Sequence, residues 1–137
     1  MPDAYKGIDL SIDGNVATLV LNAPARRNAF NSTMLTAYEA AIADIERQGE
    51  IEVVVLRGEG PAFCAGTDLK ELKTFSADDT LHWQRRTGRA VERWARLEAT
   101  TITAFHGSAV GSGAIIGLAS DLTDIYPGLS VLLRRGF

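Results

Sequence analysis

The chain opens with two strand-like apolar segments on either side of a turn. Residues 8–12 read IDLSI and residues 16–21 read VATLVL, and both are rich in β-branched and apolar side chains. Between them, residues 13–15 are Asp-Gly-Asn, which supply the positive φ that a tight hairpin connection needs. The pattern therefore predicts two antiparallel strands.

Apolar positions with a helical period follow the hairpin. Asn31 or Ser32 is placed to cap a helix that ends before Gly49. Apolar residues at i, i+1, i+4, i+7, i+8 and i+11 give this helix one buried face. These residues are Met34, Leu35, Tyr38, Ala41, Ile42 and Ile45. Residues 53–57, VVVLR, then predict a buried strand.

A second amphipathic helix is predicted to begin at Ser76. The Ser76 hydroxyl is placed to cap the helix, and Asp79 stands three residues on, as in a capping box. At 100° per residue, one face of this helix is apolar and includes both tryptophans. Its members are Trp83, Thr87, Ala90, Val91, Trp94 and Leu97. We interpret the tryptophans as core residues rather than as a stacking platform.

The opposite face of the same helix carries a stripe of arginines. Its members are Arg85, Arg89, Arg93 and Arg96. One interpretation is a solvated surface, because helices commonly place charge opposite their buried side. The other is a binding surface for phosphate or for a neighbouring subunit.

Two strand exits in the chain are rich in glycine. Residues 58–70, GEGPAFCAGTDLK, follow the predicted strand 53–57, and HGSAVGSG, residues 106–113, follows a second strand-like run at 101–105. The Gly111-Ser112-Gly113 segment then opens a small-residue apolar helix. Either loop alone is interpreted as a plain turn. Two such loops aimed at one oxygen would form an oxyanion hole from main-chain NH groups.

Composition fits one soluble globular domain, with 137 residues of which 46% are hydrophobic and 23% charged. A net charge of -3 and a pI near 5.3 give no electrostatic reason to expect nucleic acid or an anionic membrane as partner. The single cysteine, Cys64, excludes an internal disulfide and a cysteine-based zinc cluster. No signal-like segment or long apolar run occurs, so we expect a cytosolic protein.

Three motifs of this chain resemble those of the crotonase superfamily, the enoyl-CoA hydratase/isomerase-like enzymes. Residues 53–72, VVVLRGEGPAFCAGTDLKEL, are similar to its first signature, and residues 105–122, FHGSAVGSGAIIGLASDL, to its second. NAPARRNAF, residues 22–30, resembles the turn and helix entry near the start of the family. The resemblance implies an α/β fold, a truncated ClpP/crotonase-like spiral of repeated β-β-α units. It also implies acyl-CoA thioester binding and a trimeric or hexameric homo-oligomer.

The same resemblance implies the residues of a site. Two main-chain NH groups that polarise a thioester carbonyl, and stabilise an enolate-like intermediate, fall on Thr67 and Ser112. Ser112 stands where relatives with a triple glycine have Gly. The implied substrate-binding residues are Arg27 near the CoA phosphates, Ala65, Gly66, Asp68, which would mainly fix its loop, Leu69, Gly111 and Gly113. Cys64 is expected to be a packed residue rather than a nucleophile. No separate cofactor is implied, because coenzyme A is part of the substrate.

Departures from the family pattern bear on the chemistry. Hydration of an enoyl thioester suits a pair of carboxylates acting as acid and base. One family glutamate would fall on Ile115, and the second lies in a segment this chain lacks. The nearest spare carboxylates are Glu71 and Asp124. The resemblance implies an enzyme of the lyase or isomerase class, with fatty acyl-CoA metabolism as its setting. The alternative is a catalytically silent acyl-CoA-binding or assembly subunit, or a truncated remnant.

The end of the chain also departs from the family. YPGLSVLLRRGF, residues 126–137, resembles a later family stretch that normally follows the second glutamate. We therefore divide the chain into a crotonase-like core, residues 1–122, and an atypical C-terminal tail, residues 123–137, after an internal deletion and an early stop. Since family members are commonly much longer, we expect self-association or marginal stability.

A catalytic triad is a further hypothesis, because His106, Ser112 and Asp121 are all present. A serine nucleophile needs its base within hydrogen-bond reach and a third group that orients the base. The predicted elements disfavour this arrangement, since Asp121 lies beyond a helix from Ser112. We expect His106 to be a turn residue bonded to backbone, and His82 to be a helix surface residue.

Overall fold

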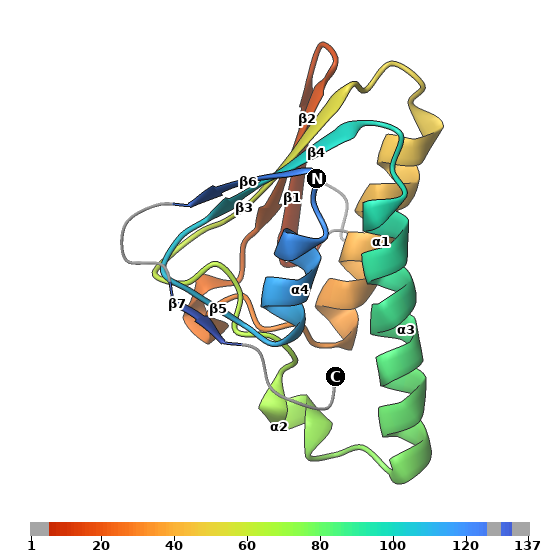
Figure 1. Cartoon of the computed structure of the whole chain (residues 1–137). Helices are drawn as coiled ribbons and strands as arrows, with labels where there is room; N and C mark the ends of the chain where they lie inside the picture. The colour runs from red at the N-terminus through yellow and green to blue at the C-terminus, as the bar shows by residue number, and fades with distance from the viewer. Residues whose placement is uncertain (1–5, 126–129, 133–137) are drawn as a thin grey trace.

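One twisted sheet organises the fold (Figure 1). The structure, a computed structural model, describes residues 6–125 and 130–132. Within them, five strands form a sheet of order β1-β2-β3-β4-β6. Strands β1 and β2 pair antiparallel, and every later pair in this sheet is parallel. The bounds are β1 Ile8–Asp13, β2 Val16–Leu21, β3 Val53–Gly58, β4 Thr100–Phe105 and β6 Leu122–Ile125.

The predicted hairpin is confirmed. Strands β1 and β2 pair from Ile8 with Leu21 to Asp13 with Val16, and Gly14 in the turn has a φ of 61°. Strand β3 pairs in parallel with both β2 and β4 and buries Val54 and Leu56 completely. Its nearly continuous apolar run is typical of a strand in the interior of a parallel sheet.

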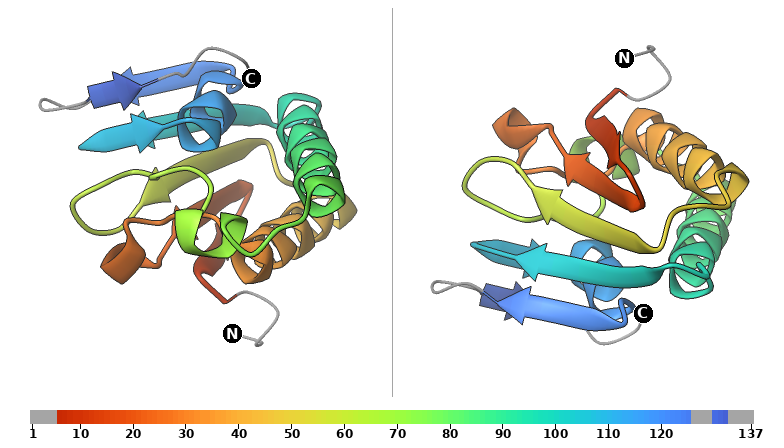
Figure 2. Two further views of the ribbon diagram at one scale, coloured as in Figure 1. Left: turned by 90° about the horizontal axis from the view of Figure 1, so that it is seen from below. Right: turned by 90° about the horizontal axis from the view of Figure 1, so that it is seen from above.

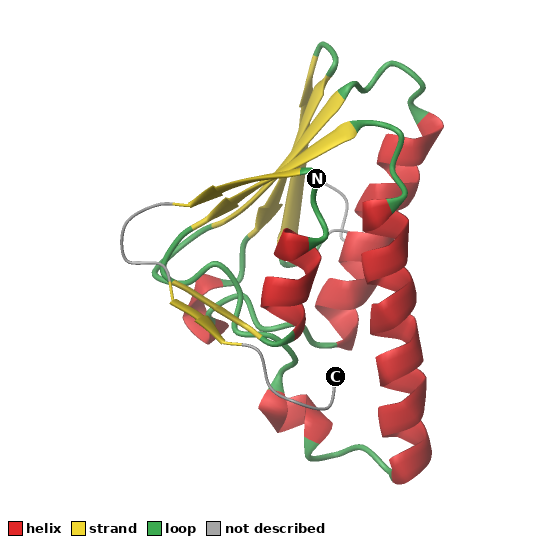
Figure 3. Cartoon of the chain, viewed as in Figure 1, coloured by secondary structure: helices red, strands yellow, loops and turns green. Residues whose placement is uncertain are grey.

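Helices α1, α3 and α4 lie together on one side of the sheet (Figure 3). Helix α1 spans Ser32–Arg47, and its N-cap is Asn31, whose side chain accepts a hydrogen bond from the Met34 NH at 2.9 Å. The helix ends before Gly49, as predicted, and all six predicted face residues are buried. The remaining helices are η2 Pro24–Arg26, α2 Leu69–Leu72, α3 Ala77–Ala95 and α4 Ser112–Leu118.

Helix α3 begins with the predicted capping box. The Ser76 hydroxyl accepts from the Asp79 NH at 3.1 Å, and the Asp79 carboxylate accepts from the Ser76 NH at 3.0 Å. These hydrogen bonds hold the pKa of Asp79 below its usual value. The apolar face prediction is confirmed, because Trp83, Ala90 and Trp94 are buried against the core.

The arginine stripe of α3 divides between solvent and a neighbouring helix. Arg85, Arg89 and Arg96 are exposed, as expected of a solvated face. Arg93 instead forms an ion pair with Glu46 of α1. Figure 2 shows α1 and α3 side by side from two directions. The ion pair of Arg93 therefore links α3 to α1.

Three short strands, β5, β6 and β7, lie where no strand was predicted. Strand β5, Ser108–Val110, pairs in parallel with β7, Ser130–Leu132. Strand β6 spans the predicted domain boundary after residue 122 and pairs with β4. Residues 126–129 and 133–137 of the predicted tail lie outside the described residues. In the part of the chain that the structure describes, no helix combines the length and apolarity needed to cross a membrane.

The core fills the space between the sheet and the helices. Trp94, Tyr38, Phe63 and Phe105 are its largest fully buried side chains. The rings of Phe63 and Phe105 lie 4.9 Å apart between centroids. This contact packs the segment after β3 against the end of β4, so the two strand exits lie next to each other.

Candidate functional site

The two glycine-rich loops pack against each other. Cys64 forms an isolated parallel bridge with Ala109, and the Val110 NH donates to the Cys64 carbonyl at 2.9 Å. Gly66 has a φ of +87°, and a Cβ at this position would lie 2.7 Å from the Val110 oxygen and 3.8 Å from the Ser112 nitrogen. Only glycine allows the main chain to approach so closely in this conformation. The residue before Thr67 therefore lies against the start of α4.

At this contact, neither of the two predicted donor NH groups has an acceptor among the residues that the structure describes. The Phe30 NH donates to the Gly66 carbonyl at 2.7 Å, and the Asp68 NH donates to the Phe30 carbonyl at 2.8 Å, so the main chain is bonded on either side of Thr67. Ser112 is the first residue of α4, where helical NH groups have no partner within the helix. Among the described residues, neither the Thr67 NH nor the Ser112 NH donates a hydrogen bond.

The loop that contains Arg27 holds the first glycine-rich loop. Arg27 adopts a left-handed conformation with a φ of 55°, and its carbonyl accepts from the Ala65 NH at 2.9 Å. Its side chain is exposed. Asp68 caps α2 and accepts from the Lys70 NH at 2.9 Å, a main-chain bond of the kind predicted for it, while Leu69 is 65% exposed. The predicted binding residues of this region thus lie on two segments, which the hydrogen bond between Ala65 and Arg27 joins.

Asn28 was missed in the sequence, although it is the most heavily bonded side chain near the site. Its amide nitrogen donates to the carbonyls of Glu59, Ala62 and Phe63 at 2.9 to 3.0 Å, and its oxygen accepts from the Ala23 NH at 2.8 Å. Asn28 is fully buried and has a φ of 58°. The available signal was an asparagine inside a turn-rich loop, since Asn tolerates the left-handed region better than most residues.

Cys64 is a packed residue, as predicted. It is fully buried, and its thiol donates to the Asn28 carbonyl at 3.2 Å and accepts from the Gly66 NH at 3.4 Å. Burial raises the pKa of Cys64 to about 12. The thiol is therefore protonated at neutral pH and is a poor nucleophile.

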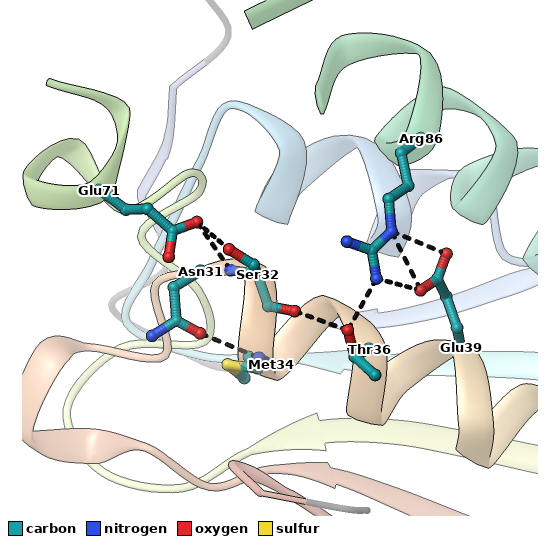
Figure 4. A network of polar contacts seen from close by, with 7 residues as sticks. All are labelled: Asn31, Ser32, Met34, Thr36, Glu39, Glu71 and Arg86. Carbon is teal, nitrogen blue, oxygen red and sulfur yellow. Dashed lines mark hydrogen bonds and ion pairs between the residues drawn. The ribbon is translucent and has the colours of Figure 1, made fainter. Parts of the chain in front are cut away.

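Glu71, one of the two spare carboxylates, is engaged by the start of α1. Figure 4 shows its carboxylate directed at Ser32, from which it accepts the NH at 2.8 Å and the hydroxyl at 2.5 Å. In the same network, Arg86 bonds Thr36 at 2.8 Å and pairs with Glu39. Glu71 therefore ties the segment after the first loop to helix α1. Asp124, the other spare carboxylate, lies exposed on β6.

The catalytic-triad hypothesis is wrong. The Nε2 of His106 bonds the Gly60 carbonyl at 2.7 Å, as expected for a turn residue. The Asp121 carboxylate accepts from the Thr101 NH at 2.9 Å. The Ser112 hydroxyl is buried and has no hydrogen-bond partner in the described part of the chain. Because each member is bonded elsewhere or unpaired, the three side chains do not form a relay.

The described residues around the start of α4 include few ionisable side chains. Ile115, at the position where the resemblance places a glutamate, is a partly buried apolar residue of α4. Within residues 6–125 and 130–132, no cluster of three or more His, Cys, Asp or Glu side chains is arranged to hold a metal ion. Where Gly66 meets the start of α4, the two loops present the main-chain NH groups of Thr67 and Ser112.

Comparison with known proteins finds one family. The model of the enoyl-CoA hydratase/isomerase family matches residues 11–125. The probable enoyl-CoA hydratase EchA14 of Mycobacterium tuberculosis is 36% identical over 118 residues, which are 86% of this chain and 46% of that protein. The 1,2-epoxyphenylacetyl-CoA isomerase of Escherichia coli is 35% identical over 115 residues, 81% of this chain and 44% of the isomerase.

Solved structures agree with these matches. An enoyl-CoA hydratase from Bacillus anthracis superposes with a TM-score of 0.87 at 26% identity, over 92% of this chain and 50% of that chain. An enoyl-CoA hydratase/isomerase from Marinobacter aquaeolei superposes with a TM-score of 0.83 at 25% identity, over 92% and 51%. The chain spans about half the length of the relatives it matches. With the fold shared and the family model covering most of its length, the chain belongs to the enoyl-CoA hydratase/isomerase family of the crotonase superfamily.

Proposed function

We propose that this chain binds acyl-CoA thioesters and polarises the thioester carbonyl between the NH groups of Thr67 and Ser112. The observation that carries the proposal is the contact between the two glycine-rich loops, at which these two NH groups have no acceptor among the described residues. Main-chain donors held in place by the fold stabilise a developing oxyanion without having to reorganise.

The rest of the loop surface suits a thioester. Gly66 and Gly113 allow the two loops to approach closely, because a Cβ at either position would meet the other loop, and Ala65 adds only a methyl group beside them. Arg27, exposed beside the Ala65 NH, is available to pair with the phosphates of coenzyme A. Ser112 retains its main-chain donor, and its side chain narrows the site relative to glycine.

Polarisation of the thioester carbonyl could assist more than one reaction. Drawing electron density onto the oxygen acidifies the Cα protons of a saturated acyl group and makes the Cβ of an enoyl group electrophilic. Hydration or isomerisation then requires a proton-transfer group. Ile115 cannot serve as one, and Glu71 is bonded to Ser32. We therefore keep two forms of the proposal: an enzyme of the hydratase/isomerase type, and a silent acyl-CoA-binding or assembly subunit.

Paired ligands test the carbonyl contact directly. Butyryl-CoA has the thioester oxygen, whereas S-butyl-CoA is a thioether that lacks it but keeps the same chain and the same nucleotide. We expect the chain to bind butyryl-CoA about tenfold more tightly in calorimetry, since two added hydrogen bonds contribute about 1 kcal/mol or more. Arg27→Ala should weaken both ligands equally. Equal affinity of the wild-type chain for the two ligands would contradict the proposal.

A second measurement separates the two forms. Crotonyl-CoA is mixed with the protein, and the absorbance of the conjugated thioester is followed as water adds across the double bond. Loss of absorbance above the background rate supports the enzyme. Binding without turnover supports the silent subunit. Trimeric or hexameric assembly and a cytosolic setting belong to the same proposal, and sedimentation of the purified chain tests the assembly.

A further inference from the structure

Trp83 of helix α3 contacts the residue that we propose as the first oxyanion donor. Its indole NH donates to the Thr67 hydroxyl oxygen at 3.2 Å. Trp83 is 6% exposed, and the Phe75 ring packs on it with 5.9 Å between centroids. Packing thus restrains the indole independently of this hydrogen bond. Its NH is aimed at the loop rather than at solvent.

Without this bond, Thr67 would be held only through its main-chain neighbours. The bonds that join Gly66 and Asp68 to Phe30 come from the loop before α1. They leave the Thr67 side chain unattached. A hydrogen bond weakens steeply as it departs from linearity, so a small rotation of the Thr67 residue would misdirect its NH. A side-chain anchor from a separate helix restrains that rotation.

We propose that Trp83 is a positioning residue, which acts through the Thr67 hydroxyl to hold the Thr67 NH in line with the thioester oxygen. This inference rests on the proposed function. It assigns roles to two side chains, because a hydroxyl at position 67 and an indole NH at position 83 act only as a pair. Helix α3 thereby becomes part of the support of the site.

The same helix provides a matched control. Trp94 is fully buried, and its indole NH donates to the Ser120 hydroxyl at 3.0 Å, beyond the end of α4. Trp83 and Trp94 thus share residue type, helix, burial and a hydroxyl acceptor. They differ in whether that acceptor belongs to the proposed oxyanion donor. A loss of packing or stability should be at least as large for Trp94→Phe as for Trp83→Phe.

The test compares Trp83→Phe, Trp94→Phe, Thr67→Val and the Trp83→Phe/Thr67→Val double variant. Two readouts are used: the affinity ratio of butyryl-CoA to S-butyl-CoA, and the infrared carbonyl frequency of bound butyryl-CoA labelled with ¹³C. We expect Trp83→Phe to reduce the ratio about threefold, as expected if one of the two hydrogen bonds to the carbonyl is lost, and to move the carbonyl band toward its frequency in an aprotic solvent. Thr67→Val should match it, and the double variant should add nothing further.

The outcomes distinguish this inference from the function on which it rests. If Trp83→Phe keeps the wild-type ratio and carbonyl band, or if Trp94→Phe lowers the ratio as much, Trp83 is not a positioning residue and the oxyanion proposal still stands. Additive losses in the double variant also overturn the pairing. If the wild-type chain shows no preference for butyryl-CoA, the proposed function itself fails.

Discussion

The two loops at the site are held by different physical means. The first, residues 64–68, is held by hydrogen bonds with Phe30, Arg27 and Trp83. The second, residues 111–113, is held by close packing: a Cβ at Gly113 would lie 2.6 Å from the Cys64 Cβ and Sγ and 2.8 Å from the Cys64 oxygen. Hydrogen bonds can be lost one at a time, whereas a packed glycine either fits or displaces its neighbours. The first loop should therefore respond in steps to the loss of its hydrogen bonds, and the second abruptly to a side chain at Gly113.

The largest effect is expected at Asn28, which supports the entry to the first loop. Asn28→Ala removes the donor to the buried carbonyls of Ala62 and Phe63 and to the part-buried carbonyl of Glu59, which should cost about 3 kcal/mol or more of unfolding free energy. Urea denaturation measures the loss. Asn22→Ala is the control, because Asn22 is exposed and, among the described residues, its side chain bonds only the Asp9 carboxylate. Similar losses in the two variants would show that hydrogen bonds do not hold this loop.

Gly113→Ala tests the packed loop and is expected to have the next largest effect. The added methyl overlaps Cys64, and overpacking of this kind costs about 1–3 kcal/mol. Binding of butyryl-CoA should be lost, because the start of α4 must move away from residues 64–66. Gly88→Ala in α3 is the control: in the described residues nothing lies within 4 Å of a Cβ there, and alanine should stabilise the helix by up to about 1 kcal/mol. Unchanged binding by Gly113→Ala would refute the packing argument.

The smallest effect concerns Cys64, which lies between the two loops. Because burial raises the pKa of Cys64 to about 12, its thiol should resist iodoacetamide at pH 8 while the chain is folded and react once the chain is unfolded. Mass spectrometry of the alkylated peptide measures the rate. Gly113→Ala should restore some reactivity by opening the contact. A native rate close to that of an unfolded cysteine would mean that the loops separate readily in solution.

The parts of the fold that follow from local signals could be predicted. The hairpin turn at Gly14, the Asn31 cap and the Ser76 capping box each depend on residues a few positions apart, and all three are confirmed. Strands β5, β6 and β7 were missed for the same reason. Each has at most four residues, and each becomes a strand only because a distant partner lies beside it.

The candidate site was predictable in its loops but not in its supports. Glycine-rich strand exits are visible in the sequence, and the family resemblance points to Thr67 and Ser112. The bonds of Asn28 to the segment after β3, of Trp83 to Thr67 and of Glu71 to Ser32 join residues far apart in the chain. Side-chain contacts of this kind depend on where the helices and loops finally lie. The periodicity of the sequence therefore does not predict them. The apolar face of α3 was predicted, whereas the acceptor of each indole NH was not.

The parallel pairing of β2, β3 and β4 also has a kinetic consequence. The thiol of Cys64 reaches the Asn28 carbonyl across 36 residues of chain, and the bridge between Cys64 and Ala109 spans the whole of α3. The entropy of closing such long loops must be overcome before these contacts stabilise anything, and chains dominated by distant contacts fold slowly. The paired NH groups therefore take shape only after the sheet has assembled. Recovery of acyl-CoA binding during refolding should lag behind recovery of the helical circular dichroism signal. The length of this lag would measure how long the two loops take to come together.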